Sequence, residues 1–252
     1  MVDKILLVTG GLSEIGLEVI NNMITNKKIN KLILCEKPDK REKLNQLRHM
    51  ILEQFNNSLD IDMLFFDAND KNEAEQQLLN CKTNFDYFLN LVGLNIFNSV
   101  LDVTEDEWDL IVDTNLKSSF FLSQAVSKKM VKSKTKGSIV LLASQHGVVA
   151  NGLRAPYCAS KAGVIQLAKS LGLELSSYGI RVNCVSPTYI LDEKSKEFLL
   201  NKEVKKEYLS KIPLKKYALP SDIANACYFL LSEESAMITG QNIIIDGGYT
   251  IW

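Results

Sequence analysis

The chain has 252 residues, which is long enough for one α/β domain with a substantial buried core. Its 29 basic and 30 acidic side chains leave a formal net charge of −1, whereas a general nucleic-acid binder shows a concentrated basic surface. No apolar run approaches the roughly 20 residues that span a bilayer, and the opening MVDKILLVTGG predicts a first core strand, not a signal peptide. We therefore expect neither a nucleic acid nor a membrane as a partner.

The numbers and spacing of the cysteines and histidines bear on the localisation of the protein and on metal binding. Five cysteines are scattered without a CxxC pair, and only two histidines are present. This pattern predicts reduced thiols in a cytoplasmic protein and no metal site.

Seven short runs rich in β-branched and apolar residues are typical of strands. The segments between them are mostly long enough for a helix, and several runs are apolar on successive residues, as in parallel strands covered on both faces. The predicted strands are Lys4–Thr9, Lys31–Glu36, Ile61–Phe66, Phe85–Val92, Gly137–Ser144, Ile180–Ser186 and Asn242–Asp246. The pattern predicts an α/β fold: a single domain over residues 1–252, with a Rossmann-like, doubly wound, seven-stranded parallel sheet and helices on both faces.

The stretch 191–216 interrupts this alternation, because from Lys194 to Lys216 it is rich in Lys, Glu and Leu. We expect it to form an amphipathic helical lid over a substrate site at the carboxyl end of the sheet. A solvated surface helix has the same composition, and charge density alone does not separate the two.

A glycine-rich turn, TGGLSEIG over residues 9–16, follows the first predicted strand and leads into a helical pattern. Glycines at such a turn let the backbone approach a pyrophosphate, and the following helix N-terminus offers free N–H groups. Glu36 closes the second strand, where an acidic side chain accepts hydrogen bonds from ribose hydroxyls and repels a 2′-phosphate. Leu12 and Ser13 add no positive charge. These features favour NAD(H) over NADP(H).

Motifs along essentially the whole chain resemble the short-chain dehydrogenase/reductase family. The turn is similar to the family's TGxxxGxG, Asn90–Gly93 stands in the place of NNAG, and YCASK at residues 157–161 matches YxxxK. The remaining motifs follow in the family's order: Asp67-Ala68, Asn115, Ser144, IRVN at residues 180–183, Pro187, and ITGQ through DGG at residues 238–248.

The resemblance implies an NAD(P)-dependent oxidoreductase that interconverts a secondary alcohol and a ketone by hydride transfer. Its catalytic tetrad would be Asn115, Ser144, Tyr157 and Lys161. The implied cofactor-binding residues are Gly10, Leu12, Ser13, Ile15, Gly16, Glu36, Asp67, Ala68, Asn90, Gly93, Tyr157, Lys161, Pro187 and Ile190.

The resemblance also implies a homotetramer or homodimer. Helices over about residues 106–132 and 156–176 would pack across one interface. The apolar positions compatible with that packing are Leu110, Ile111, Leu116, Phe120 and Phe121, although the same pattern also serves an ordinary core.

Tyr157 and Lys161 are four residues apart, so on one helix their side chains share a face. An unperturbed tyrosine has a pKa of about 10, and lowering it by about three pH units requires roughly 4 kcal/mol. We expect the lysine ammonium, the nicotinamide charge and partial dehydration to supply this together, so that Tyr157 acts as general acid or base. Ser144 would hold the substrate oxygen, and Asn115, by family analogy, would anchor a water that links Lys161 to solvent.

The main departure from the family pattern is Glu14, which takes the place of the middle glycine of the turn. A carboxylate about 5 Å from the pyrophosphate would cost on the order of 3 kcal/mol per phosphate charge. We therefore expect Glu14 to point outward, where it favours the helix N-terminus. Leu91 and Val92 replace the second Asn and the Ala of NNAG, Thr188 replaces the glycine of the PG motif, and Asp192 stands where a threonine often contacts the carboxamide.

The candidate substrate residues are Ser144, His146, Arg154 and Tyr157. His146 either lines the substrate pocket or is a hydrogen-bonded loop histidine, and the second interpretation is favoured. Arg154 either meets an anionic group of the substrate or forms a surface ion pair. Because the 146–154 and 191–215 loops decide the substrate, the sequence predicts only a small-molecule alcohol or carbonyl compound.

Two other functions stay open. A reductase of a carrier-bound 3-oxoacyl group would use NADPH and show a basic patch near the pocket mouth, and Glu36 speaks against that cofactor. A cofactor-sensing or scaffolding protein would keep the fold without turnover. Only the altered turn at Glu14 supports this last reading, and the intact tetrad argues against it.

Overall fold

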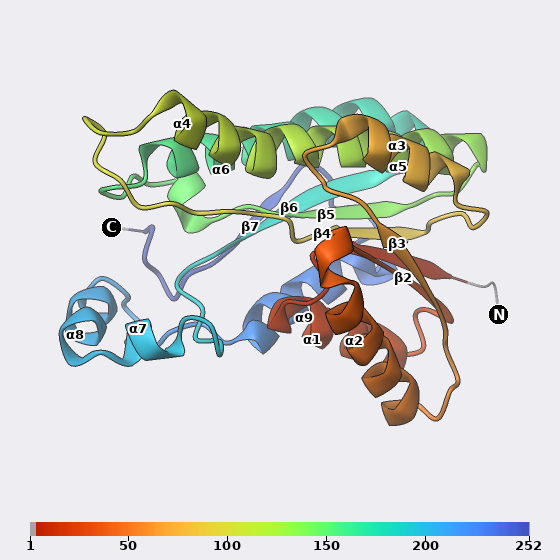
Figure 1. Ribbon diagram of the computed structural model, residues 1–252, viewed down its shortest axis with the longest axis horizontal. Coiled ribbons are helices and arrows are strands. Elements are labelled where there is room, and N and C mark those ends of the chain that lie inside the picture. Colours follow the sequence, from red (N-terminus) through yellow and green to blue (C-terminus); the bar gives the residue numbers. More distant parts are fainter. Residues whose placement is uncertain (1–3, 252) are drawn as a thin grey trace.

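The computed structural model describes residues 4–251. One sheet of seven parallel strands, in the order β3-β2-β1-β4-β5-β6-β7, lies between two layers of helices (Figure 1). The strands are β1 (Ile5–Thr9), β2 (Lys31–Glu36), β3 (Asp60–Phe65), β4 (Tyr87–Asn90), β5 (Ser138–Leu142), β6 (Arg181–Pro187) and β7 (Asn242–Ile245). The predicted Rossmann-like, doubly wound sheet is confirmed.

The helices divide between the two faces of the sheet (Figure 1). One layer consists of α1 (Glu14–Thr25), α2 (Arg41–Gln54) and α9 (Pro220–Leu231). The other consists of α3 (Lys71–Asn80), α4 (Glu105–Val112), α5 (Ser118–Lys132) and α6 (Ala155–Leu175). Two short helices, α7 (Lys196–Leu200) and α8 (Lys202–Ser210), lie apart from both layers, beyond the carboxyl end of β6.

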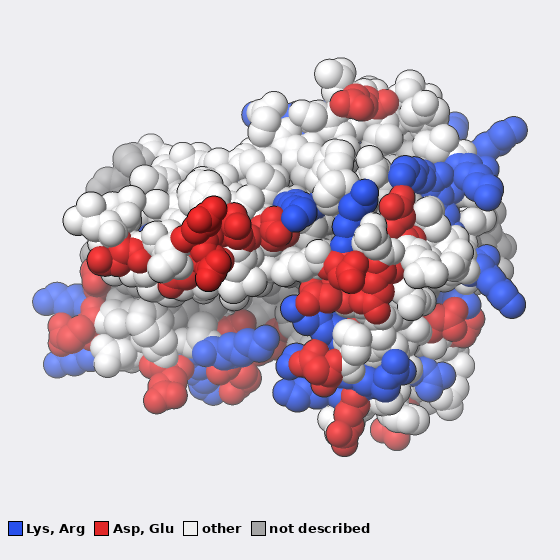
Figure 2. Space-filling model, turned by 45° about the horizontal axis from the view of Figure 1, so that its top comes forward, with Lys and Arg blue, Asp and Glu red and all other residues white. Residues whose placement is uncertain are grey.

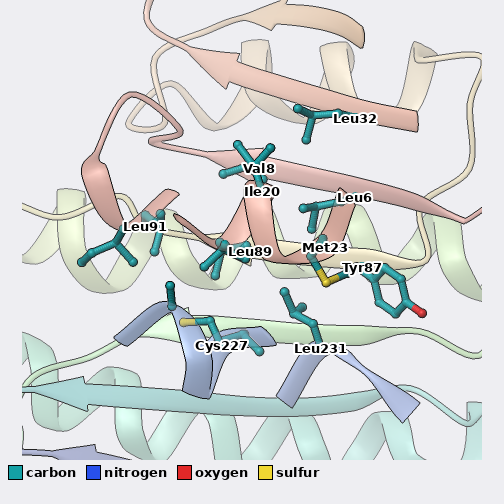
Figure 3. Packing of buried hydrophobic residues seen from close by; sticks show 14 of the residues in the cluster. Leu6, Val8, Ile20, Met23, Leu32, Tyr87, Leu89, Leu91, Cys227 and Leu231 are labelled. Atoms are coloured by element: carbon teal, nitrogen blue, oxygen red, sulfur yellow. The ribbon is translucent and has the colours of Figure 1, made fainter. Parts of the chain in front are cut away.

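Strand β1 shows why both faces carry helices. Leu6 and Val8 are fully buried in the cluster between the sheet and α1, α2 and α9 (Figure 3). Leu7 is equally buried in the opposite cluster, because successive side chains of a strand point to opposite faces. Each such side chain contributes about 1.5–3 kcal/mol on burial, so the strand is stable only when both sides are covered.

The 191–216 segment forms two helices, α7 and α8, and not the single amphipathic helix that its composition suggests. Asn201 separates them, because its side-chain oxygen accepts hydrogen bonds from the N–H groups of Glu203 and Val204 and so begins α8. Tyr208 of α8 stacks on Tyr189 with ring centroids 4.2 Å apart. The segment is therefore packed against the end of β6.

Over residues 4–251, none of the helices combines the length and apolarity that a membrane crossing requires. The same part of the chain groups no three His, Cys, Asp or Glu side chains as metal ligands. Acidic and basic side chains are interspersed on the face shown in Figure 2. That distribution matches the near-zero net charge.

Candidate active site

A groove of about 630 Å³ lies at the carboxyl ends of β1, β2 and β4. The strand order reverses between β1 and β4, and open α/β sheets bind ligands in the crevice at such a point. The lining residues are Thr9, Gly10, Leu12, Ser13, Cys35, Glu36, Lys37, Lys40, Lys43, Phe66, Ala68, Asn69, Leu91, Val92, Gly93, Leu94, Leu110, Thr114 and Lys194.

The turn between β1 and α1 has a tight, glycine-dependent backbone shape. Gly10 has a φ of 72°, and a Cβ there would lie 3.2 Å from the carbonyl carbon of Leu91, so only glycine fits. Ser13 caps α1, its hydroxyl accepting a hydrogen bond from the N–H of Gly16. The positive end of the α1 dipole thus meets the groove.

Glu14, the departure in this turn, is half-exposed and turns towards the 191–216 segment. Its Oε1 accepts a hydrogen bond of 2.8 Å from the backbone N–H of Glu193. The side chain therefore ends on a peptide group of that segment and not in free solvent. The first turn of α1 and the chain after β6 are tied together by this bond.

Glu36 is half-buried at the end of β2, where it accepts a hydrogen bond of 3.2 Å from the N–H of Leu12. Burial raises its pKa, while the Leu12 hydrogen bond and the charges of Lys194 and Lys40 act in the opposite direction. Sequence reasoning placed Glu36 here but missed the lysines: Lys37, Lys40, Lys43 and Lys194 all line the groove.

The predicted tetrad comes together from three elements. Tyr157 and Lys161 lie on α6, Ser144 follows β5, and Asn115 lies in a π-helical turn between α4 and α5. A Cβ on Gly93 would lie 3.2 Å from Lys161 Nζ and 3.5 Å from Asn115 Oδ1. The absence of a side chain at Gly93, just after β4, thus leaves the space that the Lys161 and Asn115 side chains occupy.

Lys161 is buried, and its ammonium donates a hydrogen bond of 2.8 Å to the carbonyl oxygen of Leu142. It also lies 5.8 Å from the centroid of the Tyr157 ring. Burial lowers the pKa of Lys161 to about 8.

Tyr157 keeps its proton in this setting. Burial raises its pKa, and this effect outweighs the hydrogen bond with Ser144 and the charge of Arg154, which lower it. The lowered pKa expected from the sequence is therefore absent while only protein groups surround the phenol. A protonated phenol is the form that donates a proton to a carbonyl oxygen.

Asn115 and Ser144 hold the geometry around this pair. The Asn115 side chain accepts a hydrogen bond from the N–H of Leu94 and donates to the carbonyl of Leu94 and to the Ser160 hydroxyl. The Ser144 hydroxyl oxygen accepts a hydrogen bond from the N–H of His146. Its own hydrogen is left free to donate to an oxygen acceptor, such as the phenol of Tyr157 or a substrate.

Comparison with known proteins shows the family of the chain. A family model described as enoyl-(acyl carrier protein) reductase matches residues 39–250. The NAD-dependent glycerol dehydrogenase of Listeria innocua is 32% identical over 252 residues, which cover 99% of this chain and 94% of that protein. The chain belongs to the short-chain dehydrogenase/reductase family.

Two other similar proteins are also oxidoreductases by name. The 3-oxoacyl-(acyl-carrier-protein) reductase of Staphylococcus aureus is 37% identical over 182 residues, 72% of this chain and 73% of that protein. The crystal structure of 4-hydroxyisoleucine dehydrogenase with NADH superposes with a TM-score of 0.87 at 30% identity, and covers 99% of this chain and 100% of that one. As a short-chain dehydrogenase/reductase, the chain is an oxidoreductase that acts on CH–OH groups and uses a nicotinamide cofactor.

The other predicted cofactor residues divide into two sets. Gly10, Leu12, Ser13, Glu36, Ala68 and Gly93 line the groove. The rest do not: Ile15 and Gly16 are buried in α1, Asp67 pairs with Lys37, Asn90 accepts a hydrogen bond from the Thr9 hydroxyl, Pro187 is buried, and Ile190 pairs with Ala218. These residues surround the groove without lining it.

One further observation, a buried hydroxyl just after β6, fits a bound nicotinamide cofactor. The hydroxyl oxygen of Thr188 is buried after β6 and has no hydrogen-bond partner among residues 4–251. A polar ligand group at the carboxyl end of the sheet would satisfy it. Asp192, by contrast, accepts a hydrogen bond from the N–H of Ser195 and so turns into the 191–216 segment.

Proposed function

We propose that this short-chain dehydrogenase/reductase interconverts a secondary alcohol and a ketone with NAD(H), using Tyr157 as general acid and base. The observation that carries the proposal is the convergence of Asn115, Ser144, Tyr157 and Lys161 beside a groove at the switch point of the sheet. Residues of the first turn of α1, Glu36 and Gly93 would hold the cofactor, which when bound supplies or accepts the hydride.

Each protein group has one task in this chemistry. In carbonyl reduction, the Tyr157 hydroxyl gives its proton to the substrate oxygen, and the Ser144 hydroxyl hydrogen-bonds that same oxygen. The Lys161 ammonium, held by the Leu142 carbonyl, stabilises the phenolate that remains. Asn115 links the backbone of Leu94 to Ser160 of α6 by hydrogen bonds, and so holds the helix that carries Lys161 and Tyr157 in place. Alcohol oxidation uses the same groups in reverse.

NAD(H) is the proposed cofactor because the Glu36 carboxylate sits in the groove against the Leu12 N–H. A 2′-phosphate beside it would meet like charge in a half-buried place. The glycerol dehydrogenase relative is NAD-dependent, and the 4-hydroxyisoleucine dehydrogenase structure contains NADH.

Titration with NADH and NADPH, followed by nicotinamide fluorescence, tests this proposal. We expect NADH to bind at least about tenfold more tightly than NADPH. Glu36→Ala should reduce that ratio, whereas Glu42→Ala, an exposed carboxylate on α2, should leave it unchanged. Tighter binding of NADPH to the unaltered protein would contradict the choice of NAD(H).

A second candidate function is reduction of a carrier-bound 3-oxoacyl group with NADPH. The four lysines in the groove favour it, since Lys43 and Lys194 in particular can meet a 2′-phosphate. The Staphylococcus aureus relative has this activity in its name. Saturable turnover of acetoacetyl-carrier protein with NADPH, far above that of free ketones, would select this function over the first.

A non-catalytic role as cofactor sensor or scaffold has one feature in its favour, the altered turn at Glu14. The hydrogen bond that Glu14 accepts from the backbone N–H of Glu193 weakens that argument, because it directs the carboxylate to a peptide group. If neither nicotinamide cofactor bound to the purified protein, a scaffold role would replace the enzyme role.

A further inference from the structure

Arg154 lies almost completely buried at the N-terminus of α6, three residues before Tyr157. Only 5% of its surface is exposed. Its guanidinium carbon lies 4.1 Å from the centroid of the Phe97 ring and 5.8 Å from that of Tyr189. The loop after β4 is fixed over it by a hydrogen bond from the N–H of Asn98 to the carbonyl of Leu153.

Within residues 4–251, the Arg154 charge contacts the faces of aromatic rings and no carboxylate. Its Nε lacks a hydrogen-bond acceptor among residues 4–251, and no ion pair within that range includes it. A guanidinium is always protonated, and an uncompensated buried charge is costly. The surface ion pair considered from the sequence is therefore wrong for this residue.

Arg181 shows how the same chain treats a structural arginine. Its guanidinium donates to the carbonyls of Leu230, Leu231, Ser232 and Ile238 and to the hydroxyl of Ser235. Every such bond lies within the protein, at the end of α9. Arg154 is more deeply buried, and its Nε has no such acceptor within residues 4–251, so a purely structural role leaves this donor unexplained.

The groups around Arg154 are neutral, and they lie between this residue and the part of the site that holds Tyr157. The Asn151 amide contacts His146 Nε2 at 3.2 Å and donates to the Tyr189 hydroxyl. Burial and the Arg154 charge lower the pKa of His146 to about 4, so this imidazole is uncharged at neutral pH. The Arg154 charge also acts on the Tyr157 phenol, which places it within electrostatic reach of the proton donor.

We propose that Arg154 is a specificity-determining residue that binds a carboxylate of the substrate, which makes the substrate a small hydroxy acid or the matching oxo acid. The proposal rests on the oxidoreductase function given above. A carboxylate is favoured because its two oxygens match the planar N–H fork of a guanidinium, whose surroundings here are aromatic rings and neutral amides. The acid would thus be oriented with its carbinol carbon towards Tyr157 and Ser144.

The first experiment compares two secondary alcohols that differ only in charge. Oxidation of 3-hydroxybutyrate and of 3-hydroxybutyramide is measured with NAD, with glycerol as a neutral polyol. We expect kcat/KM for the acid to exceed that for the amide by at least about tenfold, mostly through KM. Equal values for the acid and the amide, or a preference for glycerol, would overturn the proposal while leaving the oxidoreductase function intact.

Variants then show whether Arg154 is responsible. Arg154→Gln should bring the ratio of kcat/KM for the acid to kcat/KM for the amide down to about one, and Arg154→Lys should restore part of that ratio. Arg48→Gln is the matched control, because Arg48 is half-buried on α2 and donates only to the Ile61 carbonyl. An equal loss on acid and amide in Arg154→Gln would indicate a structural role.

A binding measurement separates this proposal from the failure of turnover itself. Titration calorimetry of the unaltered protein with malonate and with malonamide, each in the presence of NADH, needs no reaction and no variant. Binding of malonate at least about tenfold tighter supports the carboxylate site even if neither alcohol is oxidised. Equal or undetectable binding of both compounds overturns it.

Discussion

Lys161 is a cation that the fold buries beside the groove and supplies with one main-chain carbonyl, that of Leu142. Burial lowers its pKa from the ordinary 10.5 to about 8, so the unfolded chain holds this proton more tightly than the native one. Below pH 8 the lysine is charged in both states and opposes folding. Between pH 8 and 10.5 the native lysine loses its proton first, and its opposition to folding disappears as pH rises.

This gives a prediction for stability. The free energy of unfolding of the wild-type protein should rise relative to that of Lys161→Met by up to about 3 kcal/mol between pH 7 and 10.5. Urea denaturation of both proteins across this range measures it, since the other titrating groups are common to both. Parallel pH curves would show that Lys161 is not desolvated as strongly as its burial indicates.

Tyr157 gives a second prediction at this scale. Tyr157→Phe removes only the hydroxyl, so kcat should fall by at least about 100-fold because general acid–base catalysis is lost. The dissociation constant of NADH should change by less than about threefold. Tyr178→Phe, at an exposed tyrosine just beyond α6, is the control and should keep full activity. Retained activity in Tyr157→Phe would exclude Tyr157 as the proton donor.

The four residues of the predicted tetrad could be found from the sequence, because each lies at a set position relative to the end of a strand or to the turns of a helix. Tyr157 and Lys161 share a helix face, and Ser144 and Gly93 follow strands whose carboxyl ends meet at one edge of the sheet. Lys194 was not predictable as a groove residue, because it reaches the groove only through the path of the 191–216 segment. Arg154 was ambiguous for a related reason: sequence does not show whether an arginine is buried or what faces it.

At the level of elements, the bond from Glu14 to the Glu193 N–H joins α1 to the 191–216 segment. Because this bond ties the segment to the turn that we propose holds the cofactor, its loss should let the segment open more readily. We predict that Glu14→Ala raises the dissociation rate of NADH several-fold, measured by stopped-flow displacement. Glu18→Ala, one turn further along α1, should not change the rate.

The opposite result is equally informative. If Glu14→Ala or Glu14→Gly tightened NADH binding by about a hundredfold, the carboxylate would face the pyrophosphate in solution, as a charge about 5 Å away would require.

Strand positions followed from the sequence to within one or two residues at each end, because buried parallel strands are short apolar runs between turns. Two element details did not. The π-helical turn that holds Asn115 has the same composition as an ordinary helix, and the break at Asn201 depends on a cap of one side chain. Both are set by local hydrogen bonds that a hydrophobic pattern does not record.

At the scale of the whole molecule, we propose that α4 and α5 form an interface between copies of this chain. Of the apolar positions named from the sequence, Ile111 is buried and Leu116 packs against the core, whereas Leu110 and Phe120 are 46% and 36% exposed. Trp108 adds a further exposed apolar side chain on α4. Large exposed apolar side chains on two consecutive helices are typical of an interaction surface.

Phe120→Asp should therefore lower the molar mass in solution. Light scattering after size-exclusion chromatography should give two or four times the mass of one chain for the wild type and a smaller species for Phe120→Asp. Met50→Asp, at an exposed methionine on α2, is the control and should assemble as the wild type does. A wild-type protein that runs as a single chain would refute the interface.

The bond between Glu14 and Glu193 also bears on how such a chain can be recombined. The two residues are 179 positions apart, yet a carboxylate of the first turn of α1 accepts a hydrogen bond from a backbone N–H of the 191–216 segment. They are not independent modules. A chimera that takes residues 191–216 from a relative and keeps this turn also keeps Glu14. The backbone N–H that this carboxylate binds would then lie in a different place. Exchange of substrate segments between this chain and its relatives must carry position 14 along with the segment.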